Sequence, residues 1–474
     1  MIAESLALLP SLALLVAAGL GLQALLPAPI ERSRWARVGH GFLLGVAWNG
    51  VVSWAAAYLF GAPVGAGLFL AVTLGAAAAG AAAVAVRRGR LGGLAPGRRP
   101  ARRSLTLAMV PAVLVLSVAT FALLADAVTA PVTDFDGRMT WGTAAKYLVA
   151  DASVLPEALR ERWAYVIHPR YPLVLPLSQA AIATLGGVGI ESAAIRPFYV
   201  LFLPALFAVV APVARRAGGT LAAGLALALV FASPMLLWDK EGGALGTYSD
   251  LPLAAFLGAG FAVLAHPRAR LQPWRSLPAG VLLAAAAGAK NEGLALAAAV
   301  VIAAAATAAL AARRRRVGPL RPARAALGAA LVVGAAIALV VDWRSEIPNR
   351  NDEAYFESFS PRVALSGIAE RSPEIARLVA AETFDPDNWG ALFWLAPALL
   401  AVGWRSLRGP DVGFAALLIA FELTLATAAY AVVGDLAIVP VTWNRFVVQM
   451  LAPLVVVVAA AAGGAINVLR RPAA

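Results

Sequence analysis

Long apolar stretches alternate with short polar segments along the whole chain. Most of them are long enough to form a helix that crosses a hydrocarbon core of about 30 Å, which takes about 20 residues. We predict membrane-spanning helices over residues 5–28, 39–60, 65–86, 105–129, 195–214, 219–238, 250–265, 276–291, 293–312, 325–342, 389–403, 411–432 and 446–468. The pattern therefore predicts an all-α polytopic membrane protein with about 13 transmembrane helices.

One further apolar segment, YPLVLPLSQAAIATLGG at residues 171–187, is short and carries two prolines near its start. The arginines decide whether it crosses, because basic residues concentrate in the cytoplasmic loops of membrane proteins. If the segment does not cross, 25 of the 39 basic residues fall on one side of the membrane, and Glu31 and Asp411 are the two acidic residues on that side. If it crosses, the basic clusters divide between both sides. We therefore predict a re-entrant or interfacial helix inside one long extracytoplasmic loop, residues 130–194.

Composition agrees with this class of protein and excludes others. Hydrophobic residues make up 61% of the chain, which is too many for ordinary soluble domains. The formal charge of +13 comes from short basic clusters between apolar stretches, so it indicates membrane topology and no nucleic-acid partner. Cysteine is absent, which excludes disulfides, thiol catalysis and cysteine-ligated zinc. We expect an integral protein of a bacterial inner (plasma) membrane, in contact with membrane lipids.

Four regions follow from this topology. Residues 1–104 hold three N-terminal transmembrane helices and a basic cytoplasmic loop. Residues 105–342 form the transmembrane core, which includes the loop 130–194. Residues 343–388 are a second extracytoplasmic loop, and residues 389–474 form the C-terminal transmembrane helices. Nearly all carboxylates then lie on the outer side, where the polar chemistry converges.

Two carboxylates, Asp134 and Asp136, follow directly after the span that precedes the first outer loop. One interpretation is that they cap an interfacial helix, because Trp141, Ala145 and Leu148 recur at helical spacing behind them. The other is that a carboxylate at the rim of an outward cavity serves as a general base. Binding of a metal by the pair requires an extended backbone, since only there do residues two apart share a side.

Other outer segments carry candidate polar groups. His168 and Arg170 fit contacts to a phosphate or hydroxyl, although a rigid interfacial connector is an equal interpretation. Asp250 opens a span as an N-cap or as a second outer carboxylate. Lys290 and Glu292 stand between two apolar segments, where charges are costly unless they pair or face a polar cavity.

Two charges mark the C-terminal spans. Arg445 lies at an outer span end, where it serves as an interfacial anchor or, through its planar guanidinium, as a phosphate ligand. Glu422 lies in the middle of a span, and an intramembrane carboxylate favours a transporter. The phosphate-binding loop of nucleotide hydrolases, the glycine-rich dinucleotide motif, and the zinc-protease and serine-hydrolase motifs do not occur.

The order of these motifs resembles the GT-C superfamily of integral membrane glycosyltransferases, which includes protein O-mannosyltransferases and aminoarabinose transferases. The resemblance covers roughly residues 105–470 and rests on TDFDGRMTWGTAAKYL, HPRYPLVLPLSQAAIATLGG, YSDLPLA, GAKNEGLA and NRFVVQMLAPL. It implies a helical first extracytoplasmic loop, with Asp136 and then Asp134 as candidates for the catalytic base. It also implies that Lys290, Arg445, Arg170 and His168 bind the donor phosphate, and that Asp250, Tyr248 and Glu292 bind substrate.

The resemblance implies a reaction and a set of partners. A sugar would move from a polyprenyl-phosphate donor to a glycan, lipid or protein acceptor on the extracytoplasmic side. No cofactor is certain, and a divalent metal held by Asp134, Asp136 and Asp250 stays open. The chain departs from the family in its three extra N-terminal spans and in lacking a large soluble C-terminal domain. The alternatives are a transporter or flippase of a lipid-linked or small anionic substrate, and a ligase or polymerase of lipid-linked glycans.

Overall fold

The computed structural model describes residues 2–26, 31, 33–91, 109–161, 167–190, 192–238, 240–266, 273–314, 320–348, 360–433 and 435–470, and every regular element in these ranges is a helix. The all-helical, polytopic class predicted from the sequence is confirmed. The N-terminal region contains α1 (Ile2–Ala7), α2 (Leu9–Leu25), α3 (Arg34–Phe60) and α4 (Ala66–Leu91). The predicted first outer loop follows α5 (Val110–Ala127) and contains η2 (Gly137–Gly142), α6 (Thr143–Ala150), α7 (Glu157–Arg160), α8 (Val174–Gly186) and η3 (Ala193–Ile195).

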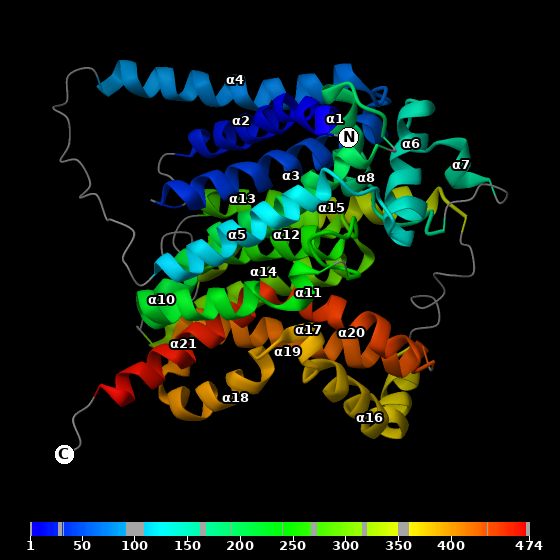
Figure 1. The fold of residues 1–474 in the computed structure, drawn as a ribbon. Helices are drawn as coiled ribbons and strands as arrows, with labels where there is room; N and C mark the ends of the chain where they lie inside the picture. The colour runs from blue at the N-terminus through cyan, green and yellow to red at the C-terminus, as the bar shows by residue number, and fades with distance from the viewer. Residues whose placement is uncertain are drawn as a thin grey trace.

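The central helices are α9 (Arg196–Val200), α10 (Phe202–Phe231), α11 (Pro234–Leu237), α12 (Asp250–Ala265), η5 (Pro273–Ser276), α13 (Leu277–Ala287), α14 (Asn291–Arg314) and α15 (Leu320–Ser345). The C-terminal helices are α16 (Pro361–Thr383), α17 (Pro386–Trp389), α18 (Leu392–Gly403), η7 (Trp404–Arg408), α19 (Pro410–Val433), α20 (Ile438–Gln449) and α21 (Leu451–Leu469). In Figure 1, α2, α3 and α4 form one side of the bundle and α16 to α20 the opposite side, with α10, α12 and α14 between them.

Within the described ranges, nine helices are long and apolar enough to cross a membrane. The difference from about 13 has two sources. Three predicted spans coincide with helices of fewer than 18 residues: α12 has 16, α13 has 11 and α18 has 12. The predicted span 195–214 and most of the predicted span 219–238 fall within one continuous candidate, residues 193–231. Whether the shorter helices also cross stays a prediction.

The candidate of residues 193–231 is two antiparallel helices. Gly219, inside α10, has φ 83° and ψ 176°, far from helical values. Phe207 and Phe231 lie on either side of it, and their ring centroids are only 5.4 Å apart. A straight helix would separate residues 24 positions apart by about 36 Å. The chain therefore reverses at Gly219, as the prediction of two spans requires.

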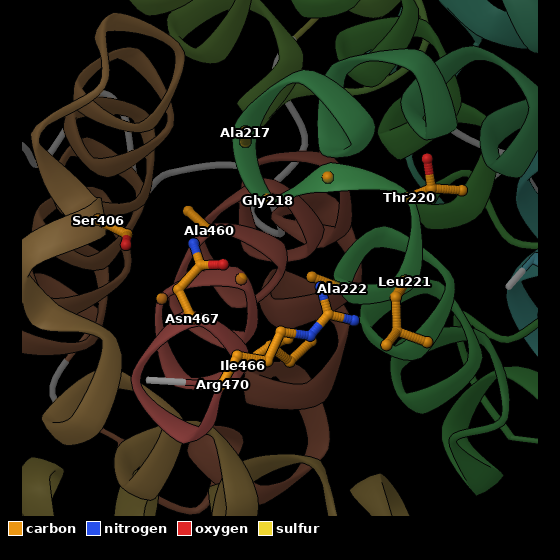
Figure 2. A pocket seen from close by; sticks show the side chains of 13 residues that line it. Ala217, Gly218, Thr220, Leu221, Ala222, Ser406, Ala460, Ile466, Asn467 and Arg470 are labelled. Carbon is orange, nitrogen blue, oxygen red and sulfur yellow. The ribbon is translucent and has the colours of Figure 1, made fainter. Parts of the chain in front are cut away.

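The reversal packs tightly against α21. A Cβ at Gly218 would meet the backbone oxygen of Ala459 at 1.8 Å, so only glycine allows this approach. Beside it lies a cavity of about 370 Å³ whose lining includes Thr220, Ser406 and Arg470. Figure 2 shows Arg470 next to the first turn of the helix that resumes after Gly219. Small residues in both helices thus fix the crossing of α10 and α21.

Helix α8, the re-entrant candidate, has 13 residues and is short for a membrane crossing. Its first ten residues are all buried, and its first N–H, on Val174, donates to the carbonyl oxygen of Gly288 at 2.8 Å. Gly288 follows α13 directly, so α8 begins beside the turn that carries Lys290. The first outer loop therefore reaches into the bundle instead of lying on its surface.

The side chain of Arg196 connects the start of this loop to the turn before α12. Its side chain is 2% exposed, and it donates to the carbonyl oxygens of Ala130 at 3.1 Å and Leu245 at 3.4 Å. It also pairs with the carboxylate of Asp126 at 3.4 Å. One guanidinium thus joins the end of α5 to the turn before α12, which brings together two segments predicted to lie on the outer side.

Candidate active site

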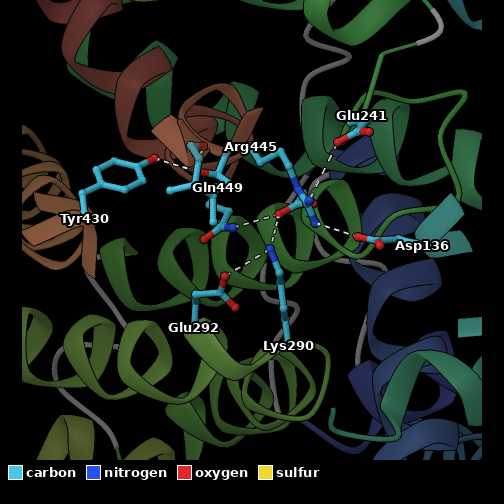
Figure 3. A network of polar contacts seen from close by, with 10 residues as sticks. Asp136, Glu241, Lys290, Glu292, Tyr430, Arg445 and Gln449 are labelled. Atoms are coloured by element: carbon cyan, nitrogen blue, oxygen red, sulfur yellow. Dashed lines mark hydrogen bonds and ion pairs between the residues drawn. The ribbon is translucent and has the colours of Figure 1, made fainter. Parts of the chain in front are cut away.

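Four side chains from distant segments meet at one end of the bundle. Asp136 comes from the first outer loop, Asp250 from the start of α12, Lys290 from the turn before α14 and Arg445 from α20. Figure 3 shows the network of contacts among them. We call Asp136, Glu241, Asp250, Lys290, Glu292, Arg445 and Gln449 the polar cluster.

Asp250 is the hub of the polar cluster and has no exposed surface. One carboxylate oxygen accepts from Lys290 Nζ at 2.8 Å and from Gln449 Nε2 at 2.9 Å. The other accepts from Arg445 Nε at 2.9 Å. A buried carboxylate costs several kcal/mol without such partners, so these donors are what allow its charge at this depth. The N-cap role expected for Asp250 is not seen, because it is the first residue of α12.

Arg445 spans the polar cluster. Besides Asp250, it meets Asp136 at 3.3 Å and Glu241 at 4.0 Å, and its guanidinium lies 4.8 Å from the centre of the Tyr248 ring. Burial opposes its charge, but the neighbouring carboxylates of Asp250 and Asp136 outweigh that effect and raise the pKa of Arg445 above its ordinary value. The guanidinium is therefore a permanent positive charge in a largely buried position.

Tyr248, predicted to bind substrate, is 3% exposed and faces Arg445. Burial, followed by the charges of Asp136 and Glu241, raises the pKa of its phenol above the ordinary value. The phenol therefore keeps its proton at neutral pH. Its ring serves as a cation–π partner for the guanidinium, an interaction of about 0.5–2 kcal/mol.

The two carboxylates of the first loop have different roles. Asp134 accepts from the backbone N–H of Thr247 at 2.9 Å and from its hydroxyl at 3.3 Å, which ties the loop to the turn before α12. Asp136 instead faces Arg445, and its side chain is 20% exposed. Asp136 is helical and Gly137 lies so close to Thr247 that a Cβ would meet its hydroxyl at 1.7 Å. The backbone here is thus not the extended form that metal binding by both carboxylates requires.

The glycine-rich turn before α12 closes over the polar cluster. Gly242 has φ +85°, and a Cβ there would lie 3.2 Å from Arg445 Cγ and 3.4 Å from Asp250 Cβ. The left-handed backbone and the close neighbours both require glycine. This turn therefore covers the contact between Arg445 and Asp250.

His168 and Arg170 lie on the segment that leads into α8. The His168 ring stacks on Tyr171 at 4.5 Å, and Tyr171 stacks on Trp141 at 5.3 Å. Trp141 belongs to η2, which begins directly after Asp136, so this segment packs beside the start of the first loop. The phosphate-binding role of His168 and Arg170 stays a prediction.

Lys290 and Glu292, expected either to pair or to face a polar cavity, do pair, at 3.2 Å. Glu292 is 24% exposed, whereas Lys290 is 5% exposed and also bonds Asp250. The ammonium group thus joins a buried and a partly accessible carboxylate. Among the described residues, no group of three or more histidine or acidic side chains is arranged to hold a metal ion.

Sequence reasoning missed Gln449, although a signal was present. It stands four residues after Arg445 on the same helix, so both side chains lie on one face of α20. Placing Arg445 at the site therefore predicts that the side chain of Gln449 also lies there. It is 4% exposed and donates to the same carboxylate, which makes α20 a two-donor support for Asp250.

Sequence reasoning also missed a set of contacts that steady the neighbours of the polar cluster. Asn444 Nδ2 donates to Glu382 at 2.8 Å, and Asn444 accepts from the indole of Trp389 at 2.8 Å. Lys240 Nζ donates to Asn388 Oδ1 at 2.6 Å. Asn444 and Lys240 are the chain neighbours of Arg445 and Glu241. The end of the second outer loop, predicted at 343–388, therefore holds both sides of the site in place.

Comparisons with protein-family models, with curated proteins and with solved structures found no match for this chain.

Proposed function

We propose that this protein is a membrane glycosyltransferase that moves a sugar from a polyprenyl-phosphate donor to a glycan, lipid or protein acceptor on the outer face of a bacterial inner membrane. The observation that supports it most is the meeting of Asp136, Asp250, Lys290 and Arg445 from four distant segments. A transferase with a lipid-phosphate donor needs a base and permanent positive charges at one membrane end, and these residues supply both.

The contacts assign different roles to the carboxylates. Asp250 has three donors and no exposed surface, so it orients the cations and does not take a proton. Within the described part of the chain, Asp136 has a single cation contact, at 3.3 Å, and it is partly exposed, so it is the better general base for an acceptor hydroxyl or amine. The donor phosphate then binds Arg445 and Lys290 in exchange for part of their carboxylate contacts. Such charge-assisted bonds stabilise the departing phosphate.

The test is transfer of radiolabelled sugar from polyprenyl phosphate by the purified full chain. We expect Asp136→Asn to lower the transfer rate by about 100-fold or more, because general base catalysis contributes about 10²–10⁴-fold. Asp151→Asn is the matched control: this exposed carboxylate of the same loop accepts, among the described residues, only a backbone N–H, from Glu157 at 3.0 Å. Full transfer by a folded Asp136→Asn protein would remove the base assignment.

One observation favours a transporter or flippase as a second candidate. Glu422 is 2% exposed inside a candidate span, and its Oε1 has no hydrogen-bond partner among the described residues. Intramembrane carboxylates of this kind recur on ion and substrate pathways. Uptake of a small anionic substrate into proteoliposomes, in the absence of any sugar transfer, would favour this candidate over the transferase.

A further inference from the structure

The cavity beside the chain reversal lies far from the polar cluster. Its volume is about 370 Å³, and it is enclosed by the turn at Gly219, by η7 and by the end of α21. Helix α21 starts near Gln449 of the polar cluster and ends at this cavity, and its 19 residues extend over about 28 Å. Pockets that bind small molecules measure about 300–1,000 Å³. The cavity is therefore large enough for a ligand of its own.

The cavity offers polar side chains that have no partner within the protein. The polar residues of its lining are Thr220, Ser406, Asn467 and Arg470. Among the described residues, none of these four side chains forms a hydrogen bond or an ion pair. Figure 2 shows the Arg470 side chain extending from α21 toward Leu221 and Ala222. Hydroxyl, amide and guanidinium donors thus surround one space, and all of them are available to a ligand.

The charge of the lining favours an anion. Arg470 is its single charged residue, and the described lining contains no carboxylate. Asp411, the acidic residue that follows η7 in the chain, is already paired with Arg216 at 3.4 Å. A guanidinium binds phosphate oxygens through two parallel N–H bonds, which makes phosphate a suitable ligand for Arg470.

Helix η7 adds positive charge beside the cavity. The helix that contributes Ser406 to the lining also carries Arg405 and Arg408, whose guanidinium groups lie 5.6 and 5.5 Å from the centre of the Trp404 ring. These cation–π contacts leave both charges in place. Trp404 is 52% exposed, and tryptophan is enriched where a membrane protein meets the headgroup region. The cavity thus opens beside features typical of the membrane–water interface.

An exposed apolar surface continues from the cavity along α10. Leu221 lines the cavity and is 38% exposed, and Leu225, four residues further along the helix, is 53% exposed. Residues four apart lie on one helix face, and here they are separated by about 6 Å along the helix axis. A free phosphate ion has no use for this surface, whereas the acyl chains of a lipid would lie along it.

We propose that this cavity binds the headgroup of an anionic phospholipid. Arg470 bonds the phosphodiester, Asn467 and Ser406 donate to headgroup oxygens, and the acyl chains lie along Leu221 and Leu225. The ammonium group of a zwitterionic headgroup would find no carboxylate in the described lining, so a headgroup with net negative charge binds better. Basic pockets between transmembrane helices on the cytoplasmic side bind such headgroups, and this end of the bundle is the one predicted to face the cytoplasm. The site does not depend on the glycosyltransferase proposal.

Native mass spectrometry of the purified, delipidated full chain in detergent tests the proposal by counting the lipids bound from added phosphatidylglycerol or phosphatidylcholine. We expect one phosphatidylglycerol per wild-type chain and binding of phosphatidylcholine that is weaker by about fivefold or more. Arg470→Ala should weaken the binding of phosphatidylglycerol about fivefold, because it removes one basic residue from the headgroup. Arg34→Ala is the matched control: this exposed arginine, predicted on the same side, lies outside the lining, so its loss should leave binding unchanged.

Asn467→Leu is a second variant that changes no charge. It keeps the size of the side chain and removes the amide, so it should also weaken the binding of phosphatidylglycerol. If Arg470→Ala does not fold, weaker binding by Asn467→Leu supports the site, and unchanged binding by Asn467→Leu overturns it.

Three results would overturn the proposal. The first is equal binding of phosphatidylglycerol and phosphatidylcholine by the wild-type chain. The second is undiminished binding of phosphatidylglycerol by a folded Arg470→Ala protein. The third is displacement of phosphatidylglycerol by inorganic phosphate at an ionic strength where chloride leaves it bound, since the cavity would then take a free anion and no lipid.

Discussion

Among the described residues, Arg445 and Arg216 each join at least two carboxylates. At one end, Arg445 lies between Asp250 and Asp136 at 2.9 and 3.3 Å. At another position, Arg216 lies between Glu31 and Asp411 at 3.3 and 3.4 Å. The distances are similar, so distance alone does not separate the two sets.

Burial and saturation do separate them. Arg216 is 28% exposed and its partners are each 15% exposed, whereas Arg445 is 13% exposed. Asp136 is 20% exposed, so the difference in burial lies at Asp250, which has no exposure. Asp250 also takes a second cation and an amide donor. An exposed pair is weak because water and salt screen it, while breaking a buried network leaves a charge without solvent. The burial of the charged groups, and not the N···O distance, therefore distinguishes the polar cluster from the pairs of Arg216.

The largest effect should come from Asp250→Ala. It leaves Lys290 and Arg445 buried without their shared carboxylate, so we expect a loss of about 3–5 kcal/mol in the free energy of unfolding. Thermal unfolding of the purified protein in detergent measures it. Asp411→Ala is the control for the other set and should cost about 1 kcal/mol or less. Equal losses in the two variants would contradict the distinction drawn from burial.

A smaller effect is expected from Gly242→Ala, which leaves every charge in place. The left-handed backbone at φ +85° costs a residue with a Cβ about 1–2 kcal/mol, and the new methyl group must also push Arg445 Cγ from 3.2 Å. Gly413→Ala, with no atom within 4 Å of an added Cβ, serves as the control. The same unfolding assay applies, and a Gly242→Ala protein as stable as the control would show that the turn does not constrain Arg445.

Much of this arrangement could be predicted because arginine content reports sidedness. Predicting that residues 171–187 form a re-entrant or interfacial helix that does not cross the membrane put Asp136 and Arg445 on one side, and these two are in contact. The same count put Glu31, Arg216 and Asp411 together on the other side, and they too are in contact. The side of the membrane on which a loop lies can be predicted from its content of basic residues, so this prediction needs no knowledge of how the helices pack.

The sequence does not reveal how deeply each charged side chain is buried or which partner it contacts. Asp134 and Asp136 looked alike, yet one bonds Thr247 and the other Arg445. Asp134 precedes the helical backbone that begins at residue 135, whereas Asp136 lies within it. Helix lengths were also misjudged at α13, since apolar composition continues past the point where Gly288 ends the helix. Both outcomes depend on contacts between segments more than 100 residues apart, as the separation of 113 residues between Asp134 and Thr247 illustrates.

The smallest loss of stability is expected from Arg216→Ala, which also tests most directly whether burial distinguishes the two sets of ion pairs. Its pairs are partly exposed, so we expect a loss of about 1 kcal/mol or less in the free energy of unfolding. High salt should shrink this loss further, because the Debye length falls to about 3 Å at 1 M and exposed charges farther apart than this are largely screened. The loss in Asp250→Ala should stay nearly constant with salt, since its partners are buried. A salt-independent loss in Arg216→Ala would mean that these pairs are shielded from solvent, and burial would then no longer distinguish the two sets.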